Sequence, residues 1–246
     1  MNSKLSKNIQ NILALGLFVG LIILIVLKTT DNPRYDLIFM DSKLLIEGFV
    51  NTIYISLITL VCSMISGFIL YIMQKSSIQF IKAVAVIFRE LIMGTPLLVM
   101  IFLGVYVLGD VINTDNKMVL GLISLTLYMS PYISNAYDSA IKIVNDDQYI
   151  VMDLYGFNPI QKYRYVIFPQ MIRPLMPQMI NNLSSIIKGS ALLKIVSISE
   201  ISYVITVISS KNWASIEGYL VMWMAYLIIT IPLSILAQYI GRRLEV

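Results

Sequence analysis

GFVNTIYISLITLVCSMISGFILYIMQ, residues 48–74, is an uncharged stretch that decides the class of this protein. A helix needs roughly 20 predominantly apolar residues to cross a hydrocarbon core of ~30 Å, and this run exceeds that length. It is also too long for a typical buried helix of a soluble protein, and the alternation of a membrane β-strand is absent. The stretch therefore predicts a membrane-spanning helix.

The composition of the whole chain supports this prediction. Of its 246 residues, 58% are hydrophobic and 13% are charged, whereas a soluble domain is about 25% charged. There is no histidine, so the commonest general base and metal ligand is missing, which argues against a hydrolase or a zinc protein. Cys62 is the single cysteine, so no disulfide can form within the chain. The net charge of +4 comes from residues between apolar runs, so we expect no nucleic-acid partner.

Apolar runs recur along the chain and predict an all-α, polytopic membrane protein with about six transmembrane helices, embedded in a lipid membrane. The first run could be a signal peptide, but it is long and lacks a small-residue cleavage site before Lys28, so we expect it to stay as a signal anchor. The predicted spans are residues 8–27, 48–74, 91–109, 118–137, 175–208 and 218–241.

Lysine and arginine asymmetry predicts the orientation of these spans. With the N-terminus inside, the inner segments hold Lys4, Lys7, Lys75, Lys82, Arg89, Lys142, Lys162, Arg164, Arg173, Arg242 and Arg243. The outer segments hold Lys28, Arg34, Lys43, Lys117 and Lys211, together with several carboxylates. We therefore expect both termini to be cytoplasmic. Isoleucine, lysine and asparagine dominate over arginine and alanine, as in AT-rich bacterial genomes, so we expect the protein in the cell membrane of a bacterium.

The polar stretch 138–173 is the only long inner loop and is predicted as helix, break, helix. Gly156 opens a cluster of helix breakers, Asn158 suits an N-cap, and Pro159 suits the first helical position. Pro169 is expected to end the second helix. The pattern fits either a helix that docks on a cytoplasmic partner or an ordinary amphipathic surface helix, and both interpretations stay open.

Several segments carry a family likeness. Residues 148–159, QYIVMDLYGFNP, and 165–174, YVIFPQMIRP, resemble the EAA loop of ABC-importer permeases of the polar amino-acid uptake type. Gln148, Gly156, Val166, Pro169, Gln170 and Arg173 match the loop pattern, whereas residues 150–152 replace its Glu-Ala-Ala.

Four other segments follow in the order of the same family. GFVNT (48–52) resembles the start of its first conserved span, and FRELIMGTPLLV (88–99) resembles F-R-G-T-P-L-L-V, with Met93 where an arginine is usual. KGSALLKIVSISE (188–200) resembles K-D-T-S-L-V-S-V-I-G-V-A-E, with Gly189 in place of the aspartate. RRL (242–244) resembles the terminal R-R-L.

The resemblance implies an ABC type I importer-like permease domain over 48–246, preceded by an added helix and linker over 1–47. It also implies a second permease subunit, cytoplasmic ATPase subunits and an extracytoplasmic solute-binding protein. The chain has no G-x-x-x-x-G-K-[ST] loop, so ATP and Mg²⁺ are expected on the partner ATPase, with no cofactor in this chain and no enzymatic activity of its own. The implied ATPase-coupling residues are Asp153, Leu154, Tyr155, Gly156, Phe157, Asn158, Pro159, Ile160 and Gln161.

Ionisable residues inside a span are expected to have a structural or functional role, because inserting each one at a helix centre costs about 2.5–3.5 kcal/mol on insertion scales. Lys188 and Glu200 are a little over three helical turns apart, so on one helix they would share a sector. They are candidates for the translocation path with Thr95 and Ser190, or else they serve packing. A break at residues 94–96 would fit either a substrate path or tight helix packing.

The alternative function is an ion-coupled secondary transporter, although such folds often show an internal repeat, and none is found here. An intramembrane enzyme would need convergent polar catalytic residues, which the sequence does not show. The favoured solute is a polar amino acid or a related small zwitterion.

Overall fold

Helices make up all the regular structure in the computed structural model, which describes residues 2–29 and 33–244. The all-α class predicted from the sequence is confirmed. The predicted N-terminal segment 1–47 includes residues 1 and 30–32, which lie outside the described residues. In chain order the elements are α1 (Asn2–Thr29), α2 (Tyr35–Phe39), α3 (Ser42–Gln74), α4 (Gln79–Met93), α5 (Leu97–Phe102), η1 (Leu103–Leu108), α6 (Gly109–Val111), α7 (Lys117–Ile141), α8 (Asp146–Leu154), α9 (Pro159–Gln161), η2 (Lys162–Ile167), α10 (Phe168–Ser190), η3 (Ala191–Val196), α11 (Ile201–Lys211) and α12 (Ser215–Leu244).

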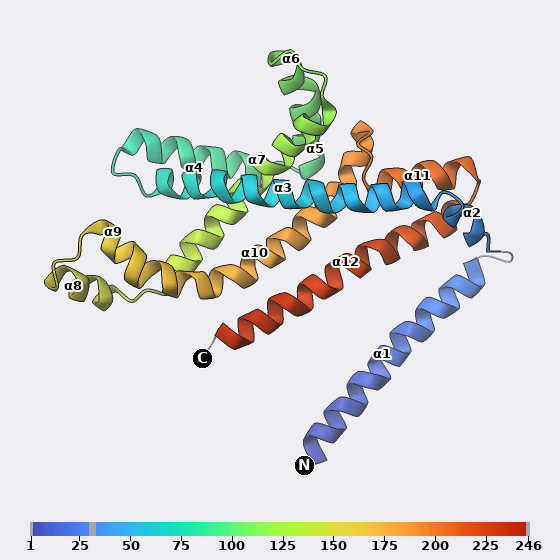
Figure 1. Ribbon diagram of the computed structural model, residues 1–246, viewed down its shortest axis with the longest axis horizontal. Coiled ribbons are helices and arrows are strands. Elements are labelled where there is room, and N and C mark those ends of the chain that lie inside the picture. Colours follow the sequence, from blue (N-terminus) through green and yellow to red (C-terminus); the bar gives the residue numbers. More distant parts are fainter. Residues whose placement is uncertain (1, 30–32, 245–246) are drawn as a thin grey trace.

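A bundle of long helices forms the centre of the molecule (Figure 1). The helix α3 packs along α7, α10 packs between α7 and α12, and α11 lies against both α3 and α12. One buried cluster joins α3, η1, α7 and η3 through Ile55, Val105, Leu125 and Leu193. A second buried cluster joins α3, α7 and α10 and includes Ile133, which is completely buried.

The length and hydropathy of the described helices identify fewer spans than the sequence pattern predicts. Two helices, α3 and α12, are long and apolar enough to cross a membrane by themselves. Two bent pairs, 79–93 with 97–111 and 159–196 with 201–211, raise the number to four if each pair is one span. The predicted count of six therefore stays a prediction, because among the described helices only these are long and apolar enough to span a membrane.

Two predicted spans are broken rather than continuous. The predicted span 91–109 begins only at Leu97, because α4 ends at Met93 and the chain turns by 110° through Gly94–Pro96. Its residues 91–93 belong to the preceding helix, and the predicted break is confirmed. The predicted span 175–208 bends by 49°, at a turn where Ser197 has φ +64.

Pro169 does not end its helix, so that prediction is wrong. The chain runs from the π-helical turn η2 into α10, which contains Pro169 in its first turn and Pro174 and Pro177 in its interior. Proline is tolerated in the first turn of an α-helix, where its missing N–H has no intrahelical partner to lose. The π-helical turn η2 ends at Ile167, and Pro169 stands in the first turn of α10, so the chain continues as a helix through it.

The contact between α3 and α7 depends on a glycine. A Cβ built on Gly67 would lie 2.9 Å from the backbone oxygen of Ser130 and 2.9 Å from Ile133 Cγ2. Small residues let membrane helices approach closely, which is how such helices gain packing energy in a bilayer.

We expect Gly67→Ala to lower the free energy of unfolding by about 1–3 kcal/mol, because the added methyl group forces α3 and α7 apart. Thermal denaturation of the detergent-solubilised protein would measure this loss. Gly20→Ala in α1 is the matched control, since nothing lies within 4 Å of its added Cβ. Equal midpoints for the two variants would contradict the close-packing role of Gly67.

Candidate functional site

The polar loop after α7 forms a separate projection from the bundle, at the far left of Figure 1. It holds α8, a tight turn and α9, after which η2 leads into α10. Asn145 begins α8, with its side chain accepting a hydrogen bond from the backbone N–H of Asp147 at 3.3 Å. The predicted sequence of helix, break and helix is therefore present.

Gly156 shapes the turn. Its φ of +68 is a left-handed conformation that side chains with a Cβ rarely adopt. The Gly156 N–H donates to Asp153 O at 3.0 Å and the Phe157 N–H donates to Met152 O at 2.9 Å, which is the bond pattern of a Schellman C-cap. Phe157 and Met152 also belong to one apolar cluster. These bonds satisfy the last carbonyls of α8 and fix the direction in which the chain reverses.

The second half of the turn is fixed by a capping box. The Asn158 side chain accepts from the Gln161 backbone N–H, and the Gln161 side chain accepts from the Asn158 backbone N–H, both at 2.9 Å. The predicted N-cap and the predicted position of Pro159 are confirmed. An ion pair between Lys162 and Asp153 links the end of α9 to the last turn of α8. The segment 153–161 is thus built as a defined shape rather than a loose loop.

The tip of this turn is apolar and faces outward. Leu154, Tyr155 and Ile160 are 81%, 78% and 76% exposed. The opposite side of the loop is packed, since Met152 and Ile167 are buried with Val144. We call Leu154, Tyr155 and Ile160 the apolar tip.

Two contacts connect the loop to the bundle. Gln170 Nε2 donates to Gln148 Oε1 at 2.7 Å, which joins α10 to α8. At the start of the loop, Asp138 forms ion pairs with Lys142 at 2.6 Å and with Lys75, at the end of α3, at 2.7 Å. Hydrogen bonds from these two ammonium groups lower the pKa of Asp138 below its usual 3.8.

Of the membrane-embedded candidates, Ser190 and Glu200 both interact with Tyr226 on α12, whereas a bend separates Lys188 from Glu200. Lys188 is exposed on α10, Lys194 is half-buried in η3, and Glu200 is completely buried. The chain bends between Lys188 and Glu200, so the expectation that they share one helical sector is wrong. Among the described residues, neither lysine is in an ion pair, so a pairing of either with Glu200 within this chain is also absent.

Glu200 caps a helix inside the bundle. Its carboxylate accepts hydrogen bonds from the backbone N–H groups of Ser202 at 3.0 Å and Tyr203 at 2.8 Å, which begin α11. It also accepts one from the hydroxyl of Tyr226 on α12 at 2.8 Å. Ser190 also interacts with Tyr226, and its hydroxyl donates to Ile187 O at 2.9 Å. The Thr95 hydroxyl, in the break after α4, donates to Leu91 O at 2.7 Å.

A cavity of about 270 Å³ between α5, α7 and α10, in which four of the nine lining residues carry polar side chains, was not predicted from the sequence. Its polar side chains are Tyr128, Tyr132, Asn182 and Ser185, and no charged residue lines it. Gly189 lines it next to the exposed Lys188. The spacing of the two tyrosines and of the Asn–Ser pair, one helical turn in each case, is the signal that could have revealed this cavity.

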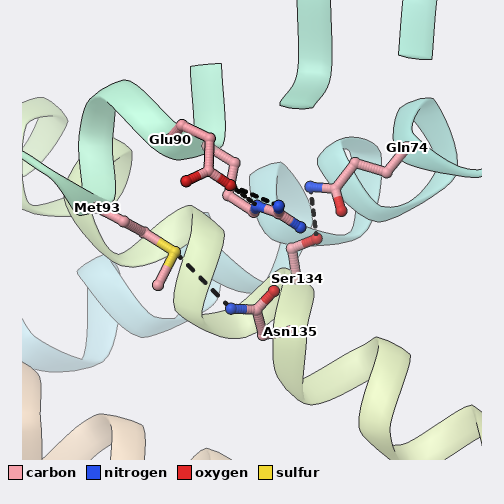
Figure 2. Close-up of polar contacts among 6 residues, drawn as sticks. Gln74, Glu90, Met93, Ser134 and Asn135 are labelled. Atoms are coloured by element: carbon pink, nitrogen blue, oxygen red, sulfur yellow. Dashed lines mark hydrogen bonds and ion pairs between the residues drawn. The ribbon is translucent and has the colours of Figure 1, made fainter. Parts of the chain in front are cut away.

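A second polar group lies where α4 ends before the break, shown in Figure 2. Arg89 pairs with Glu90 at 2.6 Å, Asn135 Nδ2 contacts Met93 Sδ at 3.9 Å, and Gln74 Nε2 donates to Ser134 Oγ at 3.5 Å. The group joins α3, α4 and α7 near the broken segment.

Comparison with known proteins gives a family for this architecture. The protein family described as "binding-protein-dependent transport system inner membrane component" matches residues 77–246 of the chain. The chain belongs to this family. A probable glutamine ABC transporter permease of Bacillus subtilis (strain 168) is 27% identical over 209 residues, which are 85% of this chain and 97% of the relative. The glutamine transport system permease of Escherichia coli (strain K12) is 24% identical and covers 82% and 94%.

Solved structures agree with the family. The crystal structure of an amino acid ABC transporter with histidines has a TM-score of 0.76 and 26% identity, covering 83% of this chain and 95% of that one. An inward-facing MetNI methionine ABC transporter shares the fold at 16% identity with a TM-score of 0.67. The resemblance of this inner-membrane component to ABC-importer permeases of the polar amino-acid type is confirmed.

We expect Asp138→Asn to lower the free energy of unfolding by about 0.5–1 kcal/mol near neutral pH, because both ion pairs are lost. The folded pKa of Asp138 is depressed, so its contribution is present above pH 3.8 and is lost as the pH falls through the lower folded value. Denaturation of both proteins at neutral pH and at pH values below 3.8 would measure this. A difference that persists unchanged in acid would contradict the assignment.

Proposed function

We propose that this chain is the membrane-spanning permease subunit of an ABC importer for a polar amino acid. A separate ATPase drives it, a solute-binding protein delivers the solute from outside, and a second permease subunit completes the pathway. Family membership and the amino-acid relatives support this proposal. The charge distribution supports cytoplasmic termini, with the loop 138–173 on the ATPase side.

The apolar tip is the observation that carries the proposal. Three large apolar side chains on a polar, water-facing loop cost solvation energy unless a partner covers them. Large apolar anchors of this kind dominate the energy of protein interfaces when they enter a pocket. The tip stands on a turn fixed by a Schellman cap, a capping box and an ion pair, so it is preorganised for docking. We propose that residues 153–161 enter a groove on the ATPase and transmit its movement to α7 and α10.

We expect Gly156→Val to reduce solute-stimulated ATPase activity of the assembled transporter at least tenfold. A β-branched residue at φ +68 costs about 1–2 kcal/mol, and the turn that presents the tip would change shape. Gly156→Asn is the matched control, because asparagine tolerates this conformation and open space surrounds the position. Membrane insertion should be normal in both variants.

Uptake that survives equally in Gly156→Val and Gly156→Asn would show that the turn does not couple the two subunits. A further variant, Tyr155→Asp, places a charge on the apolar tip without changing the backbone. It should weaken co-purification of the ATPase, while the same charge at the exposed Phe80 on α4 should not.

The four polar side chains in the cavity between α5, α7 and α10 support a solute with an uncharged side chain. Hydroxyl and amide groups can hydrogen-bond a small zwitterion, but no carboxylate or cation lines the cavity to neutralise a charged side chain. Lys188, beside Gly189 at the cavity wall, could attract the solute carboxylate. Thr95, Ser190 and Glu200 lie outside this lining, and we assign them a supporting role for the path.

We expect Asn182→Leu to reduce uptake of the solute about tenfold without changing assembly, because a binding site that loses a hydrogen-bonding group gives up about 1–3 kcal/mol. Lys188→Met tests the attraction of the carboxylate in the same assay. Transport of radiolabelled neutral and charged amino acids into proteoliposomes would measure both. Unchanged uptake in Asn182→Leu would exclude the cavity from the path.

A further inference from the structure

The polar face of α7 continues beyond the cavity toward the loop 138–173. Tyr128 and Tyr132 line the cavity from successive turns of α7, with their hydroxyl oxygens 3.4 Å apart. Asn135 follows Tyr132 by three residues, so it lies on the same face of the helix and nearer the loop. A solute that leaves the cavity along this face on the loop side therefore meets Asn135 next.

Asn135 contacts the helix end that borders the cavity. Its amide Nδ2 donates to the Sδ of Met93, the last residue of α4, at 3.9 Å (Figure 2). After Met93 the chain turns by 110°, and α5 begins at Leu97, which lines the cavity. Each partner of this contact is therefore within four residues of a lining residue, Leu97 in one case and Tyr132 in the other.

The contact between Met93 and Asn135 is one that can open at little cost. A thioether sulfur is a weak acceptor, and methionine is unbranched and flexible. Met93 is 40% exposed and Asn135 is half-buried, so water can solvate the amide when the two side chains part. Neither side chain is charged, so their separation leaves no buried ion without a partner.

The backbone is interrupted beside both partners. The helix α4 stops at Met93, and residues 94–96 are not helical. On α7, Pro131 stands inside the helix between Tyr132 and Tyr128 and cannot donate to the carbonyl four residues back. Helices bend at such prolines and breaks. Each partner can therefore move while the rest of its helix stays packed.

We propose that Met93 and Asn135 form the inner gate of the solute path, closed while they touch and open when the end of α4 moves away from α7. This inference rests on the proposed function, since it takes the cavity between α5, α7 and α10 as the solute site. It makes the break at 94–96 the hinge of the gate. The gate residues suit a zwitterionic solute, because neither offers a charge that would retain it.

Cross-linking tests whether this contact must open during transport. In a Cys62→Ser background the introduced thiols are the only ones in the chain. Met93→Cys/Asn135→Cys is linked with a short, reducible bis-methanethiosulfonate reagent in the assembled transporter. Uptake into proteoliposomes should fall about tenfold, because a closed gate would then limit turnover, and reductant should restore it.

The matched control links α3 to α7 one residue away. Gln74 Nε2 and Ser134 Oγ are 3.5 Å apart, so Gln74→Cys/Ser134→Cys places a similar link at the same level of α7 but outside the gate. This linked pair should retain its uptake. Uptake that persists in the linked Met93→Cys/Asn135→Cys pair, or an equal loss in both linked pairs, would overturn the gate.

A second measurement needs no transport. Ser185→Cys, also in the Cys62→Ser background, places a thiol in the cavity, and an impermeant maleimide is added to inverted membrane vesicles, on the side of the loop 138–173. Met93→Ala should raise the labelling rate about tenfold, because the gate no longer closes. Leu91→Ala, which trims a 66% exposed side chain of the same helix, should not.

A labelling rate that Met93→Ala leaves unchanged would also overturn the gate. The two measurements separate this inference from the proposed function. Absence of uptake in the unlinked Cys62→Ser protein would contradict the proposed function, whereas the labelling rates would still report on the gate.

Discussion

A hydrocarbon membrane core offers no hydrogen-bond partner to an open helix end, and this constraint governs how the chain of this permease is broken. Each interruption supplies its own donors and acceptors. At the bend between η3 and α11, the Glu200 carboxylate accepts from the first N–H groups of α11, and Thr52 Oγ1 accepts from the Ile201 N–H at 3.0 Å. Asn51 donates to Ser199 O at 2.8 Å, so α3 closes the same break from the other side.

The same constraint explains why a buried carboxylate is tolerated here. Glu200 is completely buried, yet it accepts two backbone hydrogen bonds and one from Tyr226. A charge without partners at this depth would be costly, whereas a fully hydrogen-bonded cap stabilises the helix start. Lys188 differs because it is exposed and can reach a polar region. Two ionisable residues of one sequence motif therefore meet different environments.

The loop after α7 closes its helix ends in a similar way. Water can satisfy a loop backbone, yet the turn 153–161 is closed by a Schellman cap, a capping box and an ion pair. The bonds hold the apolar tip outward while Met152 and Ile167 bury the other side. The bend before α11 and the turn in the loop lie at opposite ends of η2, α10 and η3.

Sequence alone determined the membrane class, the order of the apolar helices, the break at residues 94–96, the capped turn at Gly156 and the family motifs. These features depend on local composition and backbone preference, which are written in consecutive residues. It did not determine that Pro169 lies inside a helix, since the π-helical turn before it is not a local preference of those residues. Only the tertiary structure separated Lys188 from Glu200 and formed the cavity lined by Tyr128, Tyr132, Asn182 and Ser185. Those outcomes depend on how helices far apart in the chain pack together, and periodicity within one segment does not encode that packing.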